Sequence, residues 1–522
     1  MTDSMTTALA EQQTHHLKKT LGRVDIAFLL IAAVLSIEVL GQVSGFGAET
    51  LTWTVVLTVF FLVPYGLVFA ETGGAFTDEG GAYVWVRRAY GRGVAAIAAI
   101  LTWVTQPVWV GGTMAFLAVE VWSNYVSPIA SGSVSDYLFK IGFIWLTVLA
   151  AIVSLRYGKW IPTVGGITKV VFLVFFVGIV AVYGIQHGFN KLNIADFNPT
   201  VAGFLGVTPL LLFSFLGFES SNSAGGEMKN PGKDVPISIA RSAGVAAAAY
   251  LLPVFGIFLV VPTDKITGIS GLFDALKTVF TVFGPASDGM LMLSAIVFCF
   301  ILMAQGSAWM IISDRMQAMA AADGSFFAGF FGRFHKTLGT PVRVNLLSGV
   351  VGTVFMLAAM QLTGSTGAVF GVVLNISIST FLLSYLLVIP AAIRLRTRYP
   401  DIQRPFRVPG GNGVFRVLGI VCFLWILLGS WVTLFPGTLE AVVGVKYDFH
   451  GEWGVAQDTF EAFTLGTLAV LLILAVVGYL RGSVVRKQMF TGPTTSLTPD
   501  PPSARVRQFN SEAISTSEEE TP

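Results

Sequence analysis

Apolar runs of about twenty residues recur along the whole chain, and they restrict the fold more than any other feature. Each run is long enough to cross a hydrocarbon core of roughly 30 Å as a helix. Only 12% of the residues are charged and 54% are hydrophobic, whereas soluble domains carry roughly 25% charged residues. The runs are continuous, which argues against barrel strands of about ten alternating residues. The sequence therefore predicts an all-helical integral membrane protein.

Charged residues, glycines and prolines divide the apolar runs into about twelve predicted spans. The spans lie within residues 23–482, which we interpret as one membrane domain. An even number of spans returns both ends of the chain to one side, and 26 of the 32 lysines and arginines fall in segments on that side. Because basic residues are retained preferentially in cytoplasmic loops, we predict a multi-pass protein of the cytoplasmic membrane with both termini in the cytoplasm.

Two polar tails flank the membrane domain. Residues 1–22 are polar up to the first apolar run, which argues against a cleaved secretory signal and predicts a cytoplasmic N-terminal tail. Residues 483–522 combine low hydrophobicity, proline and serine clusters and an acidic end. That composition is typical of disorder, so we expect a disordered cytoplasmic C-terminal tail.

The net charge and the reactive residues disfavour several classes of function. The formal net charge is only +2 and the basic residues are spread over short loops, so we expect no nucleic-acid partner. The five histidines lie in tails or loops, and Cys299 and Cys422 lie in separate apolar runs. Neither pattern suits a metal site, a disulfide or a nucleophile with its base. We predict no catalytic residue, metal or cofactor; a membrane-embedded enzyme, and a channel with repeated filter segments, are the disfavoured alternatives.

Two spans are interrupted by small and polar residues. The first contains SIEVLGQVSGFG from Ser36, and the sixth contains SFLGFESSNSAGG from Ser214. The second interrupted span comes five spans after the first. Transporters built from two inverted repeats have this spacing, and a discontinuous helix in each half contributes to their central binding site. A lone glycine in a membrane helix more commonly serves close packing, but two matched interruptions favour a site.

Each interrupted span carries a carboxylate. An ionisable group in a bilayer costs several kcal/mol unless it is paired, protonated or hydrated, so Glu38 and Glu219 are candidates for function. Glu219 either exchanges a proton during function or, when protonated, braces the first and sixth helices. Glu38 either neutralises the ammonium group of a substrate or hydrogen-bonds freed backbone. Two charged acids would suit a cationic amine, whereas one protonated acid would suit a neutral amino acid as well.

The third and fifth spans contain further polar and aromatic residues. Trp103 and Gln106 are three residues apart and can share a helix face, and Gln106 is the stronger candidate for a cavity. We interpret Trp109 mainly as a packing residue. We interpret Lys169, in the fifth span, as a residue that extends toward the cytoplasmic headgroups.

Three passages resemble the amino acid, polyamine and organocation transporter superfamily: FSFLGFESSNSAGGEMKNPGKDVPISIARS from Phe213, FAETGGAFTDEGGAYVWVRRAYG from Phe69, and YPDIQRPFRVPGG from Tyr399. The first is the most specific, and it looks most like the bacterial branch that contains glutamate and GABA exchangers. The resemblance implies a 5+5 inverted repeat with broken helices one and six, two further C-terminal helices, and transport by alternating access.

The resemblance also implies roles for residues in both breaks. Backbone N–H groups of the first break would hold a substrate carboxylate, although SIEVLGQ replaces the Gly-Ser-Gly signature common in the family. Glu219 would be a proton-sensitive gate that contacts the first helix. The predicted substrate-binding residues are Ser36, Ile37, Glu38, Gly41, Trp103, Gln106, Phe213, Ser214, Phe215, Gly217 and Phe218.

Residues and resemblance together predict a secondary active transporter that moves an amino acid or related amine across the cytoplasmic membrane. It would work either as an exchanger or as a proton-coupled carrier. Its expected partners are a small-molecule substrate, the lipid bilayer and, in the second case, protons. A carrier of polyamines or other cationic amines is the alternative within this class.

Overall fold

The structure is a computed structural model of the chain. It describes residues 7–15, 23–153, 160–220, 222, 230–262, 266, 271–362 and 366–488. Within these ranges the chain is helical and contains no strand. Eleven helices are long and apolar enough to cross a membrane, or up to twelve when the pair Asp25–Val34 and Val39–Gly45, bent by 45°, counts as one span. The prediction of an all-helical protein with about twelve spans is confirmed.

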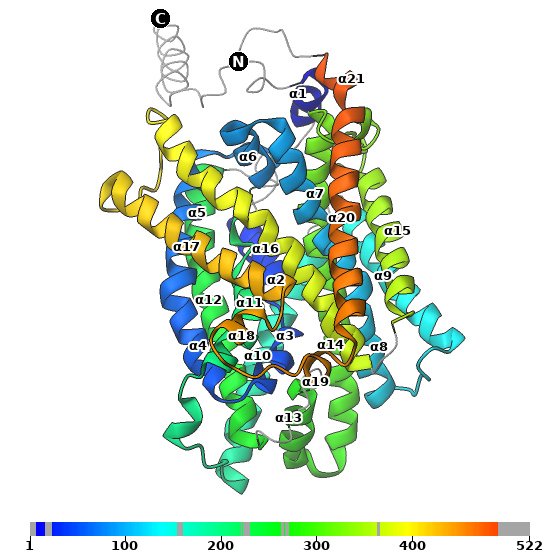
Figure 1. Cartoon of the computed structure of the whole chain (residues 1–522). Helices are drawn as coiled ribbons and strands as arrows, with labels where there is room; N and C mark the ends of the chain where they lie inside the picture. Colours follow the sequence, from blue (N-terminus) through cyan, green and yellow to red (C-terminus); the bar gives the residue numbers. More distant parts are fainter. Residues whose placement is uncertain are drawn as a thin grey trace, which may run out of the picture.

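The helices follow the chain from one end of the described residues to the other (Figure 1). They are α1 (Ala8–His15), α2 (Arg23–Val34), α3 (Val39–Gly45), α4 (Glu49–Leu57), α5 (Val63–Ala75), α6 (Ala82–Tyr90), α7 (Arg92–Trp109), α8 (Ala115–Tyr125), α9 (Val134–Val153), α10 (Trp160–His187), α11 (Val201–Phe215), α12 (Pro231–Val260), α13 (Gly271–Val279), α14 (Ser287–Ala322), α15 (Val342–Ala359), α16 (Thr366–Arg398), α17 (Gly411–Leu434), α18 (Thr438–Val442), α19 (Phe449–Trp453), α20 (Gln457–Arg481) and α21 (Ser483–Arg486). Part of the tail predicted to be disordered, residues 483–522, is helical, because Ser483–Arg486 form α21; its residues from 489 onward lie outside the described residues.

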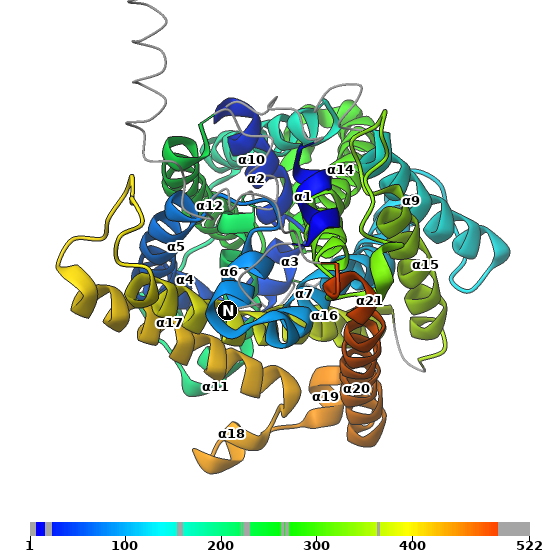
Figure 2. The same cartoon turned by 90° about the horizontal axis from the view of Figure 1, so that it is seen from above.

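The two ends of the helix bundle differ. Helices α1, α6 and α21 lie at one end, which we call the terminal face, while α13, α18 and α19 lie toward the other end, which we call the distal face (Figure 1). Viewed along the bundle, α3 and α7 lie near the centre, and α9, α17 and α20 lie at the periphery (Figure 2). Of the most apolar stretch of α16, 83% is buried, against 28% for α20. The central helices therefore face protein, and α20 lies mainly on the surface of the bundle.

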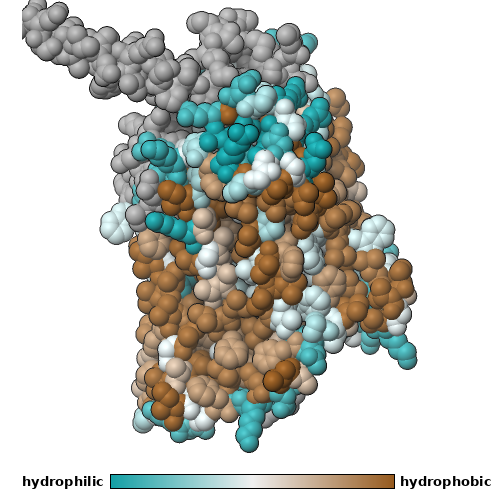
Figure 3. All heavy atoms as spheres, turned by 90° about the vertical axis from the view of Figure 1, so that its left-hand side faces the viewer, coloured by the Kyte–Doolittle hydropathy of each residue, from teal (hydrophilic) through white to brown (hydrophobic). Residues whose placement is uncertain are grey.

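The side of the bundle seen in Figure 3 is mostly apolar along its middle, with hydrophilic residues gathered toward the terminal face. Val59, Phe60 and Val63, where α4 continues into α5, are each more than half exposed, at 53%, 56% and 52%. Soluble monomers rarely expose apolar patches larger than a few hundred Å². A bilayer is the solvent that such a surface requires.

Helix α15 packs so closely against the turn that follows α7 that only glycine fits at the contact. Pro107 lies inside α7, and a π-helical turn, Val110–Met114, follows it, as proline and π-bulges commonly perturb membrane helices. A Cβ atom on Gly111, in that turn, would lie 2.2 Å from the carbonyl oxygen of Gly352 in α15. Small residues at such contacts let two backbones pack directly.

We expect Gly111→Ala to lower the stability of the protein by ~1–3 kcal/mol, because overpacking forces the two backbones apart. Gly178→Ala in α10 is the matched control, since nothing lies within 4 Å of its Cβ position and alanine favours a helix. The measurement is the thermal unfolding midpoint of the purified protein in detergent. Equal midpoints for the two variants would contradict the packing assigned to Gly111.

Candidate functional site

The first break lies between α2 and α3. Helix α2 ends at Val34, and residues 35–38 are not helical before α3 begins at Val39. The backbone N–H of Ser36 donates to the hydroxyl of Tyr250 in α12 at 2.9 Å. This segment is buried, so its freed backbone groups need partners inside the protein. A tyrosine from a distant span supplies one of them.

A buried lysine supplies further partners for the first break. The Nζ atom of Lys169, in α10, donates to the carbonyl oxygens of Ala32 at 2.7 Å and Leu35 at 2.5 Å. The side chain is fully buried, so the interpretation that Lys169 extends toward the headgroups is wrong. The carbonyls that end α2 carry the negative end of its dipole, and they attract the ammonium group more strongly than a distant headgroup region can.

Lys169 and Glu38 are joined through one amide side chain. The Nζ atom of Lys169 donates to Oε1 of Gln305 in α14 at 2.5 Å, and Nε2 of Gln305 donates to Oε1 of Glu38 at 2.8 Å. The other carboxylate oxygen of Glu38, Oε2, is buried without a hydrogen-bond partner among the described residues. The bond from Gln305 to Oε1 therefore orients the carboxylate of Glu38, and Oε2 is left available to a ligand.

The second break follows α11. That helix ends at Phe215, and after Leu216 and Gly217 a short 3-10 turn covers Phe218–Ser220. Gly217 has φ of +103°, and a Cβ there would lie 2.4 Å from the indole ring of Trp309. Both the conformation and the close ring require glycine. Its N–H donates to the hydroxyl of Tyr65 at 2.8 Å.

Glu219 is buried beside this turn, with an exposed fraction of 2%. The hydroxyl of Tyr65, in α5, donates to one of its carboxylate oxygens, and the hydroxyl of Tyr385, in α16, donates to the other. The resemblance implied contact with the first helix, but these hydrogen-bond partners of Glu219 come from two other spans. Neither partner is charged, so the carboxyl group can bind a proton without breaking an ion pair.

Aromatic rings from α7, α11, α14 and α16 pack against one another beside the second break. Phe213 lies edge-on to Trp109, with ring centroids 5.0 Å apart, and edge-on to Phe381 at 5.6 Å. Trp309 lies edge-on to Phe381 at 5.6 Å. The Nε1 atoms of Trp109 and Trp309 and the Oε1 atom of Gln106 are buried without hydrogen-bond partners in the described part of the chain. We call Trp109, Gln106, Phe213, Trp309 and Phe381 the aromatic enclosure, whose members are all buried.

The other predicted residues serve mainly packing. The hydroxyl of Ser214 donates to the carbonyl of Leu210 in its own helix at 2.8 Å, and Phe215 packs edge-on against Tyr250 at 5.7 Å. A Cβ on Gly271 would lie 3.3 Å from the Cα atom of Gly41, so Gly41 allows α3 and α13 to approach. Ile37 and Phe218 are both buried in the main core.

Trp103 lies apart from the two breaks. Its Nε1 atom donates to Oδ1 of Asp314 at 3.0 Å and to the hydroxyl of Ser348 at 2.9 Å, and its ring packs against Phe326 with centroids 6.0 Å apart. Phe326 belongs to the terminal face. Through these bonds Trp103 joins α7 to α14 and α15 and has no described contact with Glu38 or Glu219.

Sequence reasoning missed several residues that build this site. The buried lysine and glutamine were visible as polar residues within apolar runs, which is the signal that could have identified them. The aromatic ones carried no such signal, because a ring within an apolar run is ordinary. The missed residues are Tyr65, Tyr250, Gln305, Trp309, Phe381 and Tyr385, whereas Lys169 was noted but misinterpreted.

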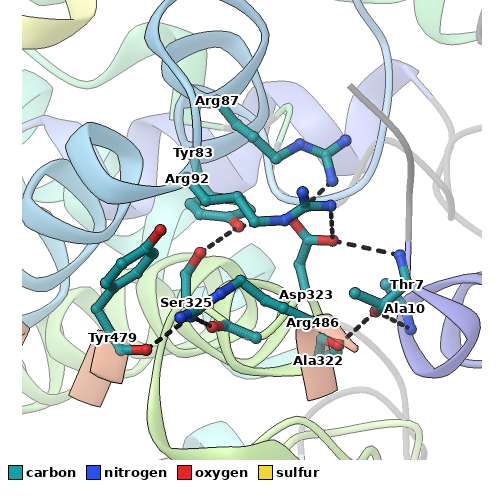
Figure 4. Close-up of polar contacts among 11 residues, drawn as sticks. Thr7, Ala10, Tyr83, Arg87, Arg92, Ala322, Asp323, Ser325, Tyr479 and Arg486 are labelled. Atoms are coloured by element: carbon teal, nitrogen blue, oxygen red, sulfur yellow. Dashed lines mark hydrogen bonds and ion pairs between the residues drawn. The ribbon is translucent and has the colours of Figure 1, made fainter. Parts of the chain in front are cut away.

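Ion pairs close the terminal face around Asp323, which follows the last residue of α14 (Figure 4). The Nη1 atom of Arg87, in α6, lies 2.7 Å from Oδ2 of Asp323, and Nε of Arg92, in α7, lies 3.0 Å from it. The hydroxyl of Tyr83 donates to the same oxygen at 2.8 Å, and the backbone N–H of Thr7 donates to Oδ1 at 3.4 Å. Three segments distant in sequence thus meet at one carboxylate.

A second set of contacts reinforces this closure. Nη1 of Arg486, in α21, donates to the carbonyls of Gly324 at 2.5 Å and Tyr479 at 2.6 Å (Figure 4). Glu71, at the end of α5, pairs with Arg396 at 2.9 Å and Arg404 at 3.1 Å. The space beside Glu219 toward this face holds only about 10 Å³. In contrast, a cavity of about 670 Å³ reaches into the bundle from the distal face.

Comparison with known families settles the class of protein. The family model described as amino acid permease matches residues 21–446. The chain belongs to the amino acid permease family.

Curated relatives of this permease are also transporters. It is 29% identical over 419 residues to a probable agmatine/putrescine antiporter of Lactococcus lactis, covering 78% of this chain and 88% of the relative. It is 28% identical over 473 residues to an uncharacterized transporter of Legionella pneumophila, covering 88% and 96%. It is 24% identical over 460 residues to a branched-chain amino acid permease of Bacillus subtilis, covering 83% and 93%. The permease is therefore a transporter rather than an enzyme.

We expect Asp323→Asn to destabilise the protein by ~3–5 kcal/mol, because it leaves two buried arginines without their counter-ion. Asp401→Asn, on an exposed residue of the same face, is the control. The thermal unfolding midpoint in detergent measures both. An equal effect of the two variants would contradict the role of Asp323.

The difference in unfolding midpoint between the wild type and Asp323→Asn should be independent of pH between about pH 5 and 8. Burial alone would raise the pKa of Asp323, but the Arg87 and Arg92 guanidinium groups outweigh it and hold that pKa below its usual value. A lowered carboxyl pKa contributes stability that is complete above the ordinary pKa of about 3.9 and is lost as the pH falls through the lower folded value. A difference that shrinks between these neutral pH values would contradict this assignment.

Proposed function

We propose that the permease exchanges or proton-couples an amino acid or related amine by alternating access, with its substrate at the aromatic enclosure. One observation carries the proposal: two broken helices each hold a buried carboxylate, Glu38 or Glu219, and the breaks meet where the side chain of Val34, at the end of α2, lies 3.4 Å from the Cβ position of Gly217. Discontinuous helices that meet in this way are the substrate sites of transporters built from inverted repeats. We therefore also propose that this chain is built from two inverted repeats.

The difference between the two faces supports alternating access. The terminal face is closed by the ion pairs of Asp323 and Glu71, and the large cavity opens at the distal face. Because basic residues favour the cytoplasmic side, we assign the terminal face and both termini to the cytoplasm of a cell membrane. The structure would then be a conformation open toward the outside.

The free oxygen of Glu38 supports binding of an amine. Oε2 lacks a hydrogen-bond partner in the described chain, whereas Oε1 is held by Gln305. A substrate ammonium group would satisfy this oxygen, and the indole N–H groups of Trp109 and Trp309 would be donors for a substrate carboxylate. Relatives are named both for amines and for branched-chain amino acids, so we propose the amino group, common to both classes, as what Glu38 binds.

Glu219 is proposed as the proton-sensitive gate. Its carboxylate accepts from the neutral hydroxyls of Tyr65 and Tyr385, which belong to α5 and α16. Gain or loss of a proton would change the hydrogen bonds between these spans and the broken α11. A change at this point would be transmitted to Gly217, whose N–H is bound by the same Tyr65 hydroxyl.

We expect Glu219→Gln to flatten the pH dependence of transport while leaving substrate-specific uptake detectable. The experiment is uptake and counterflow of a panel of labelled amino acids and diamines in proteoliposomes, with and without a pH gradient. Glu120→Gln, a partly exposed glutamate in α8, is the control and should retain the wild-type profile. Normal transport with unchanged pH dependence in Glu219→Gln would exclude the proton role.

We expect Glu38→Gln to raise the KM of an amine substrate by about tenfold or more, since a hydrogen bond to a charged group contributes ~1.5–3 kcal/mol. The maximal rate should change less, because the loss is in binding. Initial uptake rates over a range of concentrations measure both quantities, and the unfolding midpoint checks that the variant is folded. A KM equal to that of the wild type would show that Glu38 only supports the backbone.

A further inference from the structure

The cavity at the distal face is separate from the aromatic enclosure. It lies between the ends of α3, α11, α16 and α17, and the segment that carries α18 and α19 covers it. Its volume of about 670 Å³ falls within the range of roughly 300–1,000 Å³ that is usual for small-molecule sites. None of the residues of the aromatic enclosure lines it.

Carboxylates dominate the charged lining of this cavity. Glu49, Glu440, Asp448 and Glu452 line it, against the single basic residue Lys446. Two of these acids already serve the backbone: Glu49 accepts from the Thr200 N–H at 2.7 Å, and Asp448 caps α19 by accepting from the Gly451 N–H at 3.0 Å. The excess negative charge attracts cations into the cavity.

Glu440 differs from the other acids. It lies in α18, only 5% of it is exposed, and its Oε2 atom is buried without a hydrogen-bond partner among the residues the structure describes. The basic Lys446 on the same wall is not within ion-pair distance of it in any described contact. A buried carboxylate oxygen without a hydrogen-bond partner is unfavourable, and a cation that carries N–H donors would satisfy it.

Aromatic rings make the cavity suitable for an organic cation. Phe46, Tyr447 and Trp453 line it, and Nε1 of Trp453 donates to the hydroxyl of Tyr447 at 2.6 Å. Burial raises the pKa of Tyr447; the bond from Trp453 opposes this, and the nearby carboxylates of Glu452 and Glu440 add to it. Aromatic faces attract ammonium and guanidinium groups, whereas a hard metal ion needs six or more oxygen ligands.

We propose that this cavity is a second binding site, for an organic cation that bears an ammonium or guanidinium group, with Glu440 as its counter-ion. Its position at the distal face would let it bind a cation before that cation reaches the broken helices. The site needs no assumption about which substrate is carried, because the cavity, its charge and the unpaired oxygen define it.

A local reporter can separate this site from the aromatic enclosure. Lys446, exposed on the cavity wall, is replaced by cysteine in a Cys299→Ser background and labelled with a trifluoromethyl reagent. Fluorine NMR of the purified full chain in detergent then follows titration with putrescine at neutral pH. We expect a saturable change in chemical shift, absent when sodium chloride is added to equal ionic strength.

The decisive comparison replaces one carboxylate at a time. Glu440→Gln should weaken putrescine binding by about tenfold or more, Glu440→Asp should retain part of the affinity, and Glu461→Gln, outside the cavity on α20, should bind as wild type. Equal binding by Glu440→Gln, or an equal shift with sodium chloride, would overturn the proposal. If Glu440→Gln fails to fold, loss of affinity in Glu440→Asp relative to Glu461→Gln decides the question.

Binding and transport test different proposals. A wild-type protein that binds putrescine at the labelled cavity but exchanges no substrate in proteoliposomes would support the distal site and contradict the proposed function. Transport that is normal in a protein whose cavity gives no saturable signal would contradict the distal site alone.

Discussion

A hydrocarbon core contains no water to satisfy the backbone, and at the end of α2 the ammonium group of Lys169 takes its place. Nζ binds two carbonyl oxygens that the interruption leaves free and also the side chain of Gln305. Through that amide the lysine orients Glu38. The first broken helix, its carboxylate and the packing of α10 and α14 around them thus depend on one buried charge.

The second break obeys the same requirement with neutral groups. The hydroxyl of Tyr65 accepts from the N–H of Gly217 and donates to Glu219, while Tyr385 donates to the other oxygen of that carboxyl group. The amine of Lys169 binds the backbone of the first break, whereas the hydroxyls of Tyr65 and Tyr385 bind the second break and its carboxylate. We therefore propose the proton response at Glu219, whose carboxylate is bound by hydroxyl groups.

Hydropathy predicted the spans, because each must be apolar over its full length, and clusters of small and polar residues predicted both breaks. The partners of the breaks could not be predicted in this way. Lys169 was misinterpreted since a sequence does not show that α10 passes beside α2. Tyr65 and Tyr385 are indistinguishable from packing residues until the helices are placed. Trp103 has the helical spacing of a site residue, but periodicity does not reveal that its indole meets Asp314.

The choice of ion pairs to close the terminal face has a physical consequence for the cycle. Desolvation of buried charges offsets most of their attraction, so the contacts of Asp323 with Arg87 and Arg92 define the closed arrangement without stabilising it greatly. Opening would return these charges to water, which recovers their hydration. If apolar side chains closed the same area, opening would expose hydrophobic surface to water instead. A ligand can shift a two-state equilibrium only by its difference in affinity for the two states. A face closed by ion pairs therefore needs only a small difference in ligand affinity between the closed and the open state.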